Sequence, residues 1–121
     1  MATVDITSEN FSEHVTDTGI VLLDFWAAWC GPCQQFGPIF EKASEKYPDI
    51  TFGKVDTDAQ QELAAGFGIT SIPTLYAFRD GIILYSEPGA MNGKNLNALI
   101  DQIVSLDMDD VRTKLAARNA S

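Results

Sequence analysis

The chain has 121 residues, of which 45% are hydrophobic and 21% charged, and its formal net charge is −9. This length and composition predict one globular domain whose core can form without a metal or a disulfide. The acidic surface would repel phosphate backbones and anionic lipids, which argues against nucleic-acid and membrane binding. The stretch MATVDITSENF does not resemble a signal peptide, and no segment approaches a membrane span, so we expect a cytoplasmic protein.

The first half of the chain predicts alternating strands and helices. Residues 3–6 favour a short strand, and a weak helical pattern follows it. Residues 19–28 form a nearly continuous apolar run, which is typical of a central strand covered on both faces. Helical spacing appears over residues 36–43, where Pro38 is expected to kink the helix. Residues 49–56 again indicate a strand.

The second half adds a helix, a hairpin and a last helix. Thr57 and Gln60 have the spacing of a capping box, which predicts a helix that begins there and ends at Gly66. The Asp-Gly pair at residues 80–81 separates two apolar stretches and therefore predicts a β-hairpin. Apolar residues at helical spacing predict the last helix from about Asn92.

The order β-α-β-α-β-α-β-β-α predicts an α/β fold. We expect a central mixed sheet of five strands, mostly parallel with one antiparallel edge hairpin, and helices on both faces. This domain is expected over residues 1–105, with a C-terminal extension over residues 106–121 that is helical and packs weakly. The pattern leaves open whether a new helix starts near Asp107 or the preceding helix continues.

Both cysteines lie in the stretch FWAAWCGPCQQF, at positions 30 and 33. A tetrahedral zinc site needs four ligands, but the chain adds only His14, outside the motif. A disulfide across so short a loop would stabilise the fold by only about 2 kcal/mol, and permanent disulfides are rare in the cytoplasm. Redox exchange is therefore the favoured interpretation, ahead of a metal site or a structural brace.

The predicted position of Cys30 favours a reactive thiolate. Cys30 would follow the end of a buried strand and stand at the N-terminus of the next helix, where free amides and the helix dipole stabilise an anion. Gly31 would let a partner approach, and Pro32 suits the first helical turn. Cys33 would lie one turn along, near enough to attack a mixed disulfide formed on Cys30.

Three stretches of the sequence resemble the thioredoxin family. VLLDFWAAWCGPC is similar to its active-site signature, and SIPT (71–74) and PGA (88–90) are similar to its two flanking loops. The resemblance, over about residues 3–105, implies the thioredoxin fold and a protein-disulfide reductase with no bound cofactor or metal. It also implies a monomer that acts on disulfide-containing client proteins through a redox-active Cys30–Cys33 disulfide, recharged by a flavoprotein, the NADPH-dependent thioredoxin reductase.

The resemblance assigns roles around the cysteines. Cys30 is expected to be the nucleophile, and Cys33, which is less exposed in the family, the resolving cysteine. Asp24 is the only charge in its apolar run, so burial should raise its pKa. Asp24 matches the family's buried acid and Lys54 matches that acid's partner. We expect Asp24 to accept the proton of Cys33 through water, with Lys54 tuning it; the alternative is an Asp24 that simply pairs with Lys54.

The same resemblance implies a docking surface for client proteins. Pro73 matches the family's cis-proline, which would present the backbone of Ile72 for strand-like pairing with a substrate segment. Trp26, by contrast, is expected in the core beneath the active-site loop. The expected apolar docking surface around Cys30 consists of Trp29, Gly31, Pro32, Ile72, Pro73, Gly89 and Ala90.

Two departures from the family pattern and two rival functions remain. Gln34 stands where the family usually has a basic residue, so the Cys30 thiolate should be less stabilised. Pro88 replaces a small apolar residue and removes one amide at the edge of the docking surface. An oxidase or isomerase of exported proteins is disfavoured by the Gly-Pro between the cysteines and by the lack of a signal peptide. A non-catalytic binding subunit or chaperone is weakened by the intact cysteines.

Overall fold

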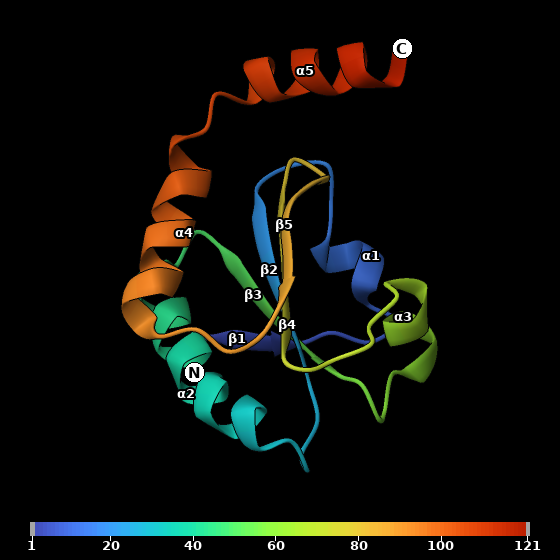
Figure 1. Ribbon diagram of the computed structural model, residues 1–121, viewed down its shortest axis with the longest axis vertical. Helices are drawn as coiled ribbons and strands as arrows, with labels where there is room; N and C mark the ends of the chain where they lie inside the picture. Colours follow the sequence, from blue (N-terminus) through green and yellow to red (C-terminus); the bar gives the residue numbers. More distant parts are fainter. Residues whose placement is uncertain (1, 121) are drawn as a thin grey trace.

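The computed structural model of the protein describes residues 2–120, which build one mixed sheet between two layers of helices (Figure 1). The strand order is β1-β3-β2-β4-β5, so the expected fold of five strands is confirmed. The strands are β1 (Thr3–Asp5), β2 (Ile20–Trp26), β3 (Thr51–Asp56), β4 (Thr74–Arg79) and β5 (Ile82–Pro88). The helices are α1 (Phe11–His14), α2 (Gly31–Lys46), α3 (Gln61–Gly66), α4 (Gly93–Ser105) and α5 (Met108–Ala120).

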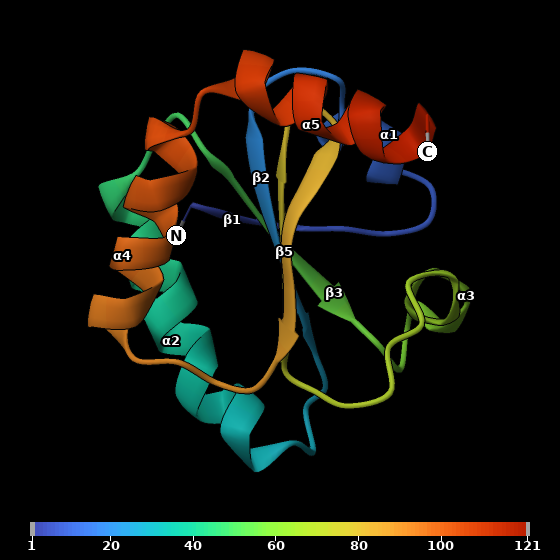
Figure 2. The same ribbon diagram turned by 45° about the horizontal axis from the view of Figure 1, so that its top comes forward.

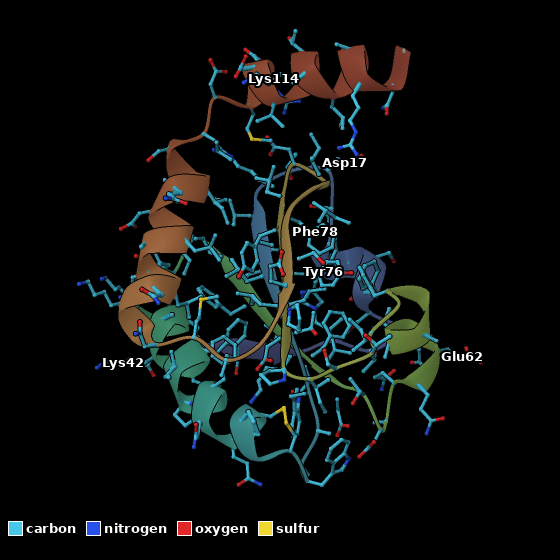
Figure 3. The ribbon with its side chains drawn as sticks, in the orientation of Figure 1. Asp17, Lys42, Glu62, Tyr76, Phe78 and Lys114 are labelled. Atoms are coloured by element: carbon cyan, nitrogen blue, oxygen red, sulfur yellow. A yellow bond between two sulfur atoms is a disulfide. The ribbon has the colours of Figure 1, made fainter. Side chains whose placement is uncertain are left out.

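Helices α2 and α4 cover one face of the sheet, and α1 and α3 cover the other (Figures 1 and 2). The central strand β2 serves both cores because successive side chains point to opposite faces. Leu22 packs with Phe40 of α2, whereas Phe25 belongs to the cluster that faces α1 and α3. Tyr76 and Phe78 of β4 point into that second layer (Figure 3). By the same alternation, Asp24 faces α2.

Antiparallel pairing extends further than the predicted edge hairpin. Strands β1, β3 and β2 are parallel, but β4 is antiparallel to β2, with Thr74 opposite Phe25, as well as to β5. The connection from β3 to β4 contains only the short helix α3 and does not run back along the whole sheet. The six residues of α3 span about 9 Å, whereas a strand of six residues spans about 20 Å. The chain therefore stays at the end of the sheet where β3 finished, and β4 starts from that end.

The turn signals in the sequence agree with the structure at the hairpin but only partly at α3. Asp80 and Gly81 connect β4 to β5 with φ angles of 54° and 79°, which confirms the predicted turn. The predicted capping box is wrong, because α3 begins at Gln61 and the Thr57 hydroxyl donates to the Trp26 carbonyl at 3.0 Å. The helix ends at Gly66 as predicted. Pro38 lies within α2, and its expected kink stays a prediction.

The C-terminal residues form a separate helix instead of continuing α4. The Asn92 side chain caps α4 at 2.8 Å, and α4 ends at Ser105. Asp107 then accepts hydrogen bonds from the amides of Asp109 and Asp110 at 3.0 and 3.2 Å, which starts α5. Helix α5 lies across the hairpin end of the sheet (Figures 1 and 2). The division into a domain over 1–105 and an extension over 106–121 stays a prediction.

Candidate active site

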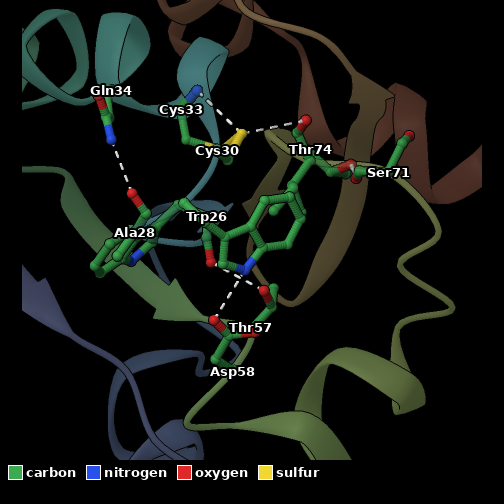
Figure 4. Close-up of a disulfide and its surroundings, with 11 residues drawn as sticks. Trp26, Ala28, Cys30, Cys33, Gln34, Thr57, Asp58, Ser71 and Thr74 are labelled. Atoms are coloured by element: carbon green, nitrogen blue, oxygen red, sulfur yellow. Dashed lines mark hydrogen bonds between the residues drawn. A yellow bond between two sulfur atoms is a disulfide. The ribbon is translucent and has the colours of Figure 1, made fainter.

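Cys30 lies where the chain leaves the sheet and enters α2. Strand β2 ends at Trp26, and Cys30 is the N-cap of α2, in an extended conformation with φ −90° and ψ 114°. The amide of Cys33 donates to the Cys30 sulfur at 3.2 Å, and a disulfide joins the two cysteines (Figure 4). The predicted setting is therefore present: a sulfur at a helix N-terminus with a backbone amide directed at it.

The two sulfurs differ in what they face more than in how much of them is exposed. Cys30 is 5% exposed and Cys33 4%, so the expected difference in exposure is small in this disulfide form. Cys30 lines a surface groove, however, and Cys33 does not. The Cys30 sulfur also lies 3.7 Å from the carbonyl oxygen of Ile72. This is a contact in the disulfide, whereas a reduced thiol could donate its hydrogen to that oxygen.

The groove beside Cys30 has a volume of about 620 Å³ and contains four of the seven predicted docking residues. Trp29 lines the groove; it is 71% exposed, and its indole nitrogen donates to Asp58 at 3.0 Å. The sequence did not predict that residues of α3 and of the loop after it also line the groove, because nothing in their residue types signals a binding surface. The lining residues are Trp29, Cys30, Gly31, Pro32, Thr57, Gln61, Ala64, Ala65, Ile69, Thr70, Ser71 and Ile72.

The remaining docking residues lie behind and beside the groove. The Ile72–Pro73 peptide bond is cis, as the resemblance implied, and Pro73 is buried. Gly89, with a φ of 107°, donates its amide to the Pro73 carbonyl at 2.7 Å. Gly89 and Ala90 line a separate hollow of about 440 Å³, so the predicted residues form two neighbouring depressions instead of one.

Asp24 is fully buried on the α2 face of the sheet, and neither of its carboxyl oxygens has a hydrogen-bond partner among residues 2–120. Burial raises the pKa of Asp24 from 3.8 to about 7, and the nearby positive charge of Lys54 opposes that rise. The raised pKa predicted from the apolar run is confirmed. Near neutral pH the carboxyl group is therefore present in both its protonated and its ionised form.

Lys54 is the cross-strand neighbour of Asp24, but its ammonium group is directed elsewhere. The Nζ atom lies 3.8 Å from Glu41 Oε1 and 5.0 Å from the centre of the Trp26 ring. Within the described part of the chain, no ion pair joins Lys54 to Asp24, although the Lys54 charge still lowers the pKa of Asp24 through space, and the role of Lys54 as its partner stays a prediction. Glu41 was not singled out in the sequence, because an acidic residue in an amphipathic helix carries no signal of its partner.

The described residues offer little to a metal ion. In the span 2–120, no group of three or more His, Cys, Asp or Glu side chains is arranged to hold one. No helix in the same span has the length and apolar character that crossing a membrane requires. The site instead combines the Cys30 sulfur at the groove, the Cys33 sulfur bonded to it and the buried carboxyl group of Asp24 on the preceding strand. These are the parts required for thiol–disulfide exchange.

The thioredoxin family model matches residues 2–104. The chain belongs to the thioredoxin family. It is 54% identical over 119 residues to a Streptomyces coelicolor protein named "Putative thioredoxin 2", covering 98% of this chain and 89% of that one. It is 38% identical to Bacillus subtilis thioredoxin over 103 residues, covering 84% of this chain and 98% of the relative. The structure of Malassezia sympodialis thioredoxin (Mala s 13) superposes with a TM-score of 0.73 and 35% identity, covering 84% and 91% of the two chains.

Membership of the thioredoxin family confirms the activity expected from the sequence. The protein is a dithiol–disulfide oxidoreductase, and its redox-active pair is Cys30 and Cys33. Members of this family act on disulfides of client proteins and exchange electrons with a reductase. The structure adds the geometry through which this thioredoxin presents one of its two sulfurs.

Proposed function

We propose that this thioredoxin reduces disulfides in client proteins with Cys30 as the nucleophile and Cys33 as the resolving cysteine. One observation carries the assignment: Cys30 lines the groove and its sulfur accepts a hydrogen bond from the amide of Cys33, whereas Cys33 does not line the groove. A thiolate at Cys30 would be stabilised by that amide and by the helix dipole. A client disulfide entering the groove would meet this sulfur first.

The proposed exchange has two displacement steps. The Cys30 thiolate attacks one sulfur of the client disulfide; a bond forms between Cys30 and the client, and the other client sulfur leaves as a thiolate. The Cys33 thiolate then attacks the Cys30 sulfur and releases the second client sulfur. Two electrons have passed to the client, which takes up two protons, and Cys30 and Cys33 are left as the observed disulfide.

Asp24 is proposed as the group that takes the proton of Cys33. Cys33 lies in α2, Asp24 lies on the face of β2 that α2 covers, and the pKa of Asp24, about 7, suits an acceptor that works near neutral pH. Neither Asp24 oxygen forms a hydrogen bond to Cys33 in the described chain, so we propose that the proton passes through a water molecule between them. Asp24→Asn should therefore slow turnover near neutral pH while the fold is retained. Unchanged reduction kinetics across the pH range would remove Asp24 from the mechanism.

The groove is proposed as the docking surface for an extended client segment. The Ile72 carbonyl lies beside the Cys30 sulfur, where it can accept a backbone hydrogen bond from a client. Trp29, Gly31 and Pro32 would contact the client around its disulfide. Pro73 would support the Ile72 backbone from behind, and Gly89 and Ala90 would extend the contact into the neighbouring hollow.

Family likeness supports the remaining proposals. We expect the flavoprotein thioredoxin reductase to reduce the Cys30–Cys33 disulfide with electrons from NADPH. We also expect a monomer with no bound cofactor, in the cytoplasm, where the dithiol form is maintained.

The 106–121 extension is proposed as an addition to the catalytic domain of residues 1–105. Helix α5 lies at the opposite end of the sheet from the start of α2 (Figure 1), which supports that view.

Insulin reduction with a chemical reductant tests the cysteine assignment. Cys30→Ser should abolish the catalysed rate, whereas Cys33→Ser should trap a mixed disulfide between Cys30 and the client. Mass spectrometry of the trapped complex identifies the attacking sulfur. A Cys30→Ser variant that retains catalysis, or a Cys33→Ser variant that forms no complex with its client, would contradict the assignment.

A further inference from the structure

Glu41 and Lys54 form an ion pair beside the buried acid. Glu41 lies on α2, two helical turns beyond Cys33, and its Oε1 atom is 3.8 Å from Lys54 Nζ. The side chains of Lys54 and Glu41 are 17% and 33% exposed, so the pair lies at the boundary between the core and solvent. A charge pair in this position is screened less than one on the open surface.

Lys54 has two carboxylates within its range, and the structure shows which one it contacts. Asp24 and Lys54 are direct neighbours across β2 and β3, where opposite charges usually attract. The Asp24 oxygens nevertheless have no hydrogen-bond partner in the described chain, and the ammonium group lies at Glu41 and over the Trp26 ring. Over residues 2–120, the close contacts of the ammonium group are therefore with Glu41 and Trp26, and it forms no hydrogen bond to Asp24.

The path of the Lys54 side chain runs beneath α2. A Cβ atom placed on Gly37 would lie 3.8 Å from Lys54 Nζ, so the ammonium passes close to the helix backbone there. Glu41 follows Gly37 by four residues and lies on the same helix face. The small residue leaves room for the lysine, and the acid one turn further along receives its charge.

Few other charged or titratable groups face the Asp24 carboxyl. On β2 its same-face neighbours are Leu22 and Trp26, and on β4 the register partner is Leu75, all without charge. On β3 the register partner is Lys54; α2, the helix on this face of the sheet, carries Cys33 and Glu41 and has Cys30 as its N-cap. In the disulfide form the cysteines do not titrate, so Lys54 is the charge that acts on Asp24, and Glu41 is the carboxylate that Lys54 contacts.

We propose that Glu41 is a positioning residue for thiol–disulfide exchange: it holds the Lys54 ammonium at the outer edge of the site and so leaves the Asp24 carboxyl unpaired. An ammonium that moved onto Asp24 would stabilise the carboxylate and weaken it as a base. Glu41 thus acts on the reacting sulfurs through Lys54 and Asp24, without touching them. The positioning half of this inference is that Glu41 keeps the Lys54 ammonium off Asp24. The catalytic half is that this keeps Asp24 an effective base, and only the catalytic half rests on the proposed role of Asp24.

The positioning half is tested on the oxidised protein, in which neither cysteine titrates. Carbon-13 NMR of labelled aspartate carboxyls gives the pH midpoint of Asp24 directly. In Glu41→Gln the freed lysine should lower that midpoint by about one pH unit. Glu45→Gln, a change of the same kind one turn along α2 at a residue that forms no ion pair with Lys54, should leave it unchanged.

A double-variant cycle separates the lysine route from a direct effect of the Glu41 charge. In a Lys54→Met background, Glu41→Gln should move the Asp24 midpoint by less than about a third of its effect in the wild type. An equal effect in both backgrounds, or no effect of Glu41→Gln alone, overturns the inference. Circular dichroism on each variant confirms that the fold is retained.

The pH dependence of insulin reduction tests the catalytic half. In Glu41→Gln the pH at which Asp24 limits turnover should fall together with the NMR midpoint, and Glu45→Gln should follow the wild type. A shifted NMR midpoint with an unmoved rate profile would refute Asp24 as the proton acceptor while the Glu41–Lys54 positioning stands. An unmoved midpoint together with an Asp24-dependent rate profile would refute the positioning and leave the proposed function intact.

Discussion

Charged side chains are paired at the hairpin end of the sheet, whereas in the described part of the fold the buried carboxyl group of Asp24 is unpaired. At the hairpin end, Arg79 donates hydrogen bonds to the carbonyls of Ile103, Val104 and Leu106, at 2.8 to 3.2 Å. Asp80 accepts from the Gly19 amide at 3.0 Å and pairs with Arg112 at 2.9 Å. Toward the cysteine end, the fully buried Asp24 has no hydrogen-bond partner among the described residues.

The charged groups at the hairpin end stabilise the folded state, whereas the ionised form of Asp24 destabilises it. The hairpin-end groups lie near the surface and satisfy backbone atoms, so each contributes a modest stabilisation. The buried carboxyl is costly to ionise, yet that cost brings its pKa near neutrality. The charges that stabilise the fold and the carboxyl group proposed to take part in catalysis therefore lie toward opposite ends of one sheet.

The largest expected effect comes from removing the buried charge. The pKa of Asp24 rises from 3.8 to about 7 on folding, roughly three pKa units at about 1.4 kcal/mol each. Between these values the folded state binds more protons than the unfolded state, so stability falls as the pH rises toward 7. Asp24→Asn should therefore increase the free energy of unfolding by about 2–4 kcal/mol at pH 8, and by little at pH 4.

Urea denaturation across this pH range measures the Asp24 effect. Asp49→Asn, at an exposed carboxyl, is the matched control and should give the same pH dependence as the wild type. An Asp24→Asn protein less stable than the wild type at pH 8 would show that the carboxylate is stabilised in the folded state, and the contrast between the two ends would be lost.

A smaller effect is expected at the rim of the groove. Trp29→Phe keeps an aromatic surface but removes the hydrogen bond to Asp58, so kcat/KM for insulin reduction should fall about fivefold. Because Trp29 is 71% exposed, the free energy of unfolding should change by less than about 0.5 kcal/mol. Asp58→Ala should reproduce the kinetic loss, whereas Asp58→Asn retains an acceptor and should restore most of the rate. A lower free energy of unfolding with an unchanged kcat/KM would contradict the prediction and show that Trp29 stabilises the fold without contributing to client binding.

At the hairpin end, Arg112→Ala removes the ion pair that joins α5 to Asp80. We expect a loss of about 0.5–1 kcal/mol in the free energy of unfolding, reduced at high salt, and faster amide exchange in α5. Insulin reduction should be unaffected. Lys114→Ala breaks only a pair within α5, with Asp110 at 3.0 Å, and should change stability less. A drop in catalytic rate would show that the two ends are coupled.

The smallest effect is expected at Gln34, whose side-chain amide donates to the Ala28 carbonyl at 2.8 Å. Gln34→Lys places a positive charge near the cysteines and should move Cys30 thiol ionisation to lower pH by about half a pH unit or less, because the site is exposed. The pH dependence of alkylation of the reduced protein measures this. Gln35→Lys, which adds the same charge one position along the helix, should have less effect. A midpoint that does not fall in Gln34→Lys would contradict the prediction.

Local patterns were sufficient for most of the fold and for the two cysteines. The apolar run around Asp24 predicted a buried strand and a raised pKa, and the Asp-Gly pair at 80–81 predicted the hairpin. The capping box at Thr57 failed because the hydroxyl bonds to Trp26, on a strand distant in sequence. A pattern is thus reliable where its partners lie within a few residues, and less so where a distant segment competes for the same group.

The sequence by itself determined the order of strands and helices, the cysteine pair at a helix start and the isolated acid within a buried strand. Only the tertiary structure decided the direction of β4, the α3 wall of the groove, the place of α5 and the pairing of Lys54 with Glu41 instead of Asp24. The physical reason is the distance along the sequence between the groups that interact. Hydrogen bonding and burial within one element follow from neighbouring residues, whereas the partner of a long side chain depends on which distant segments the packing brings beside it.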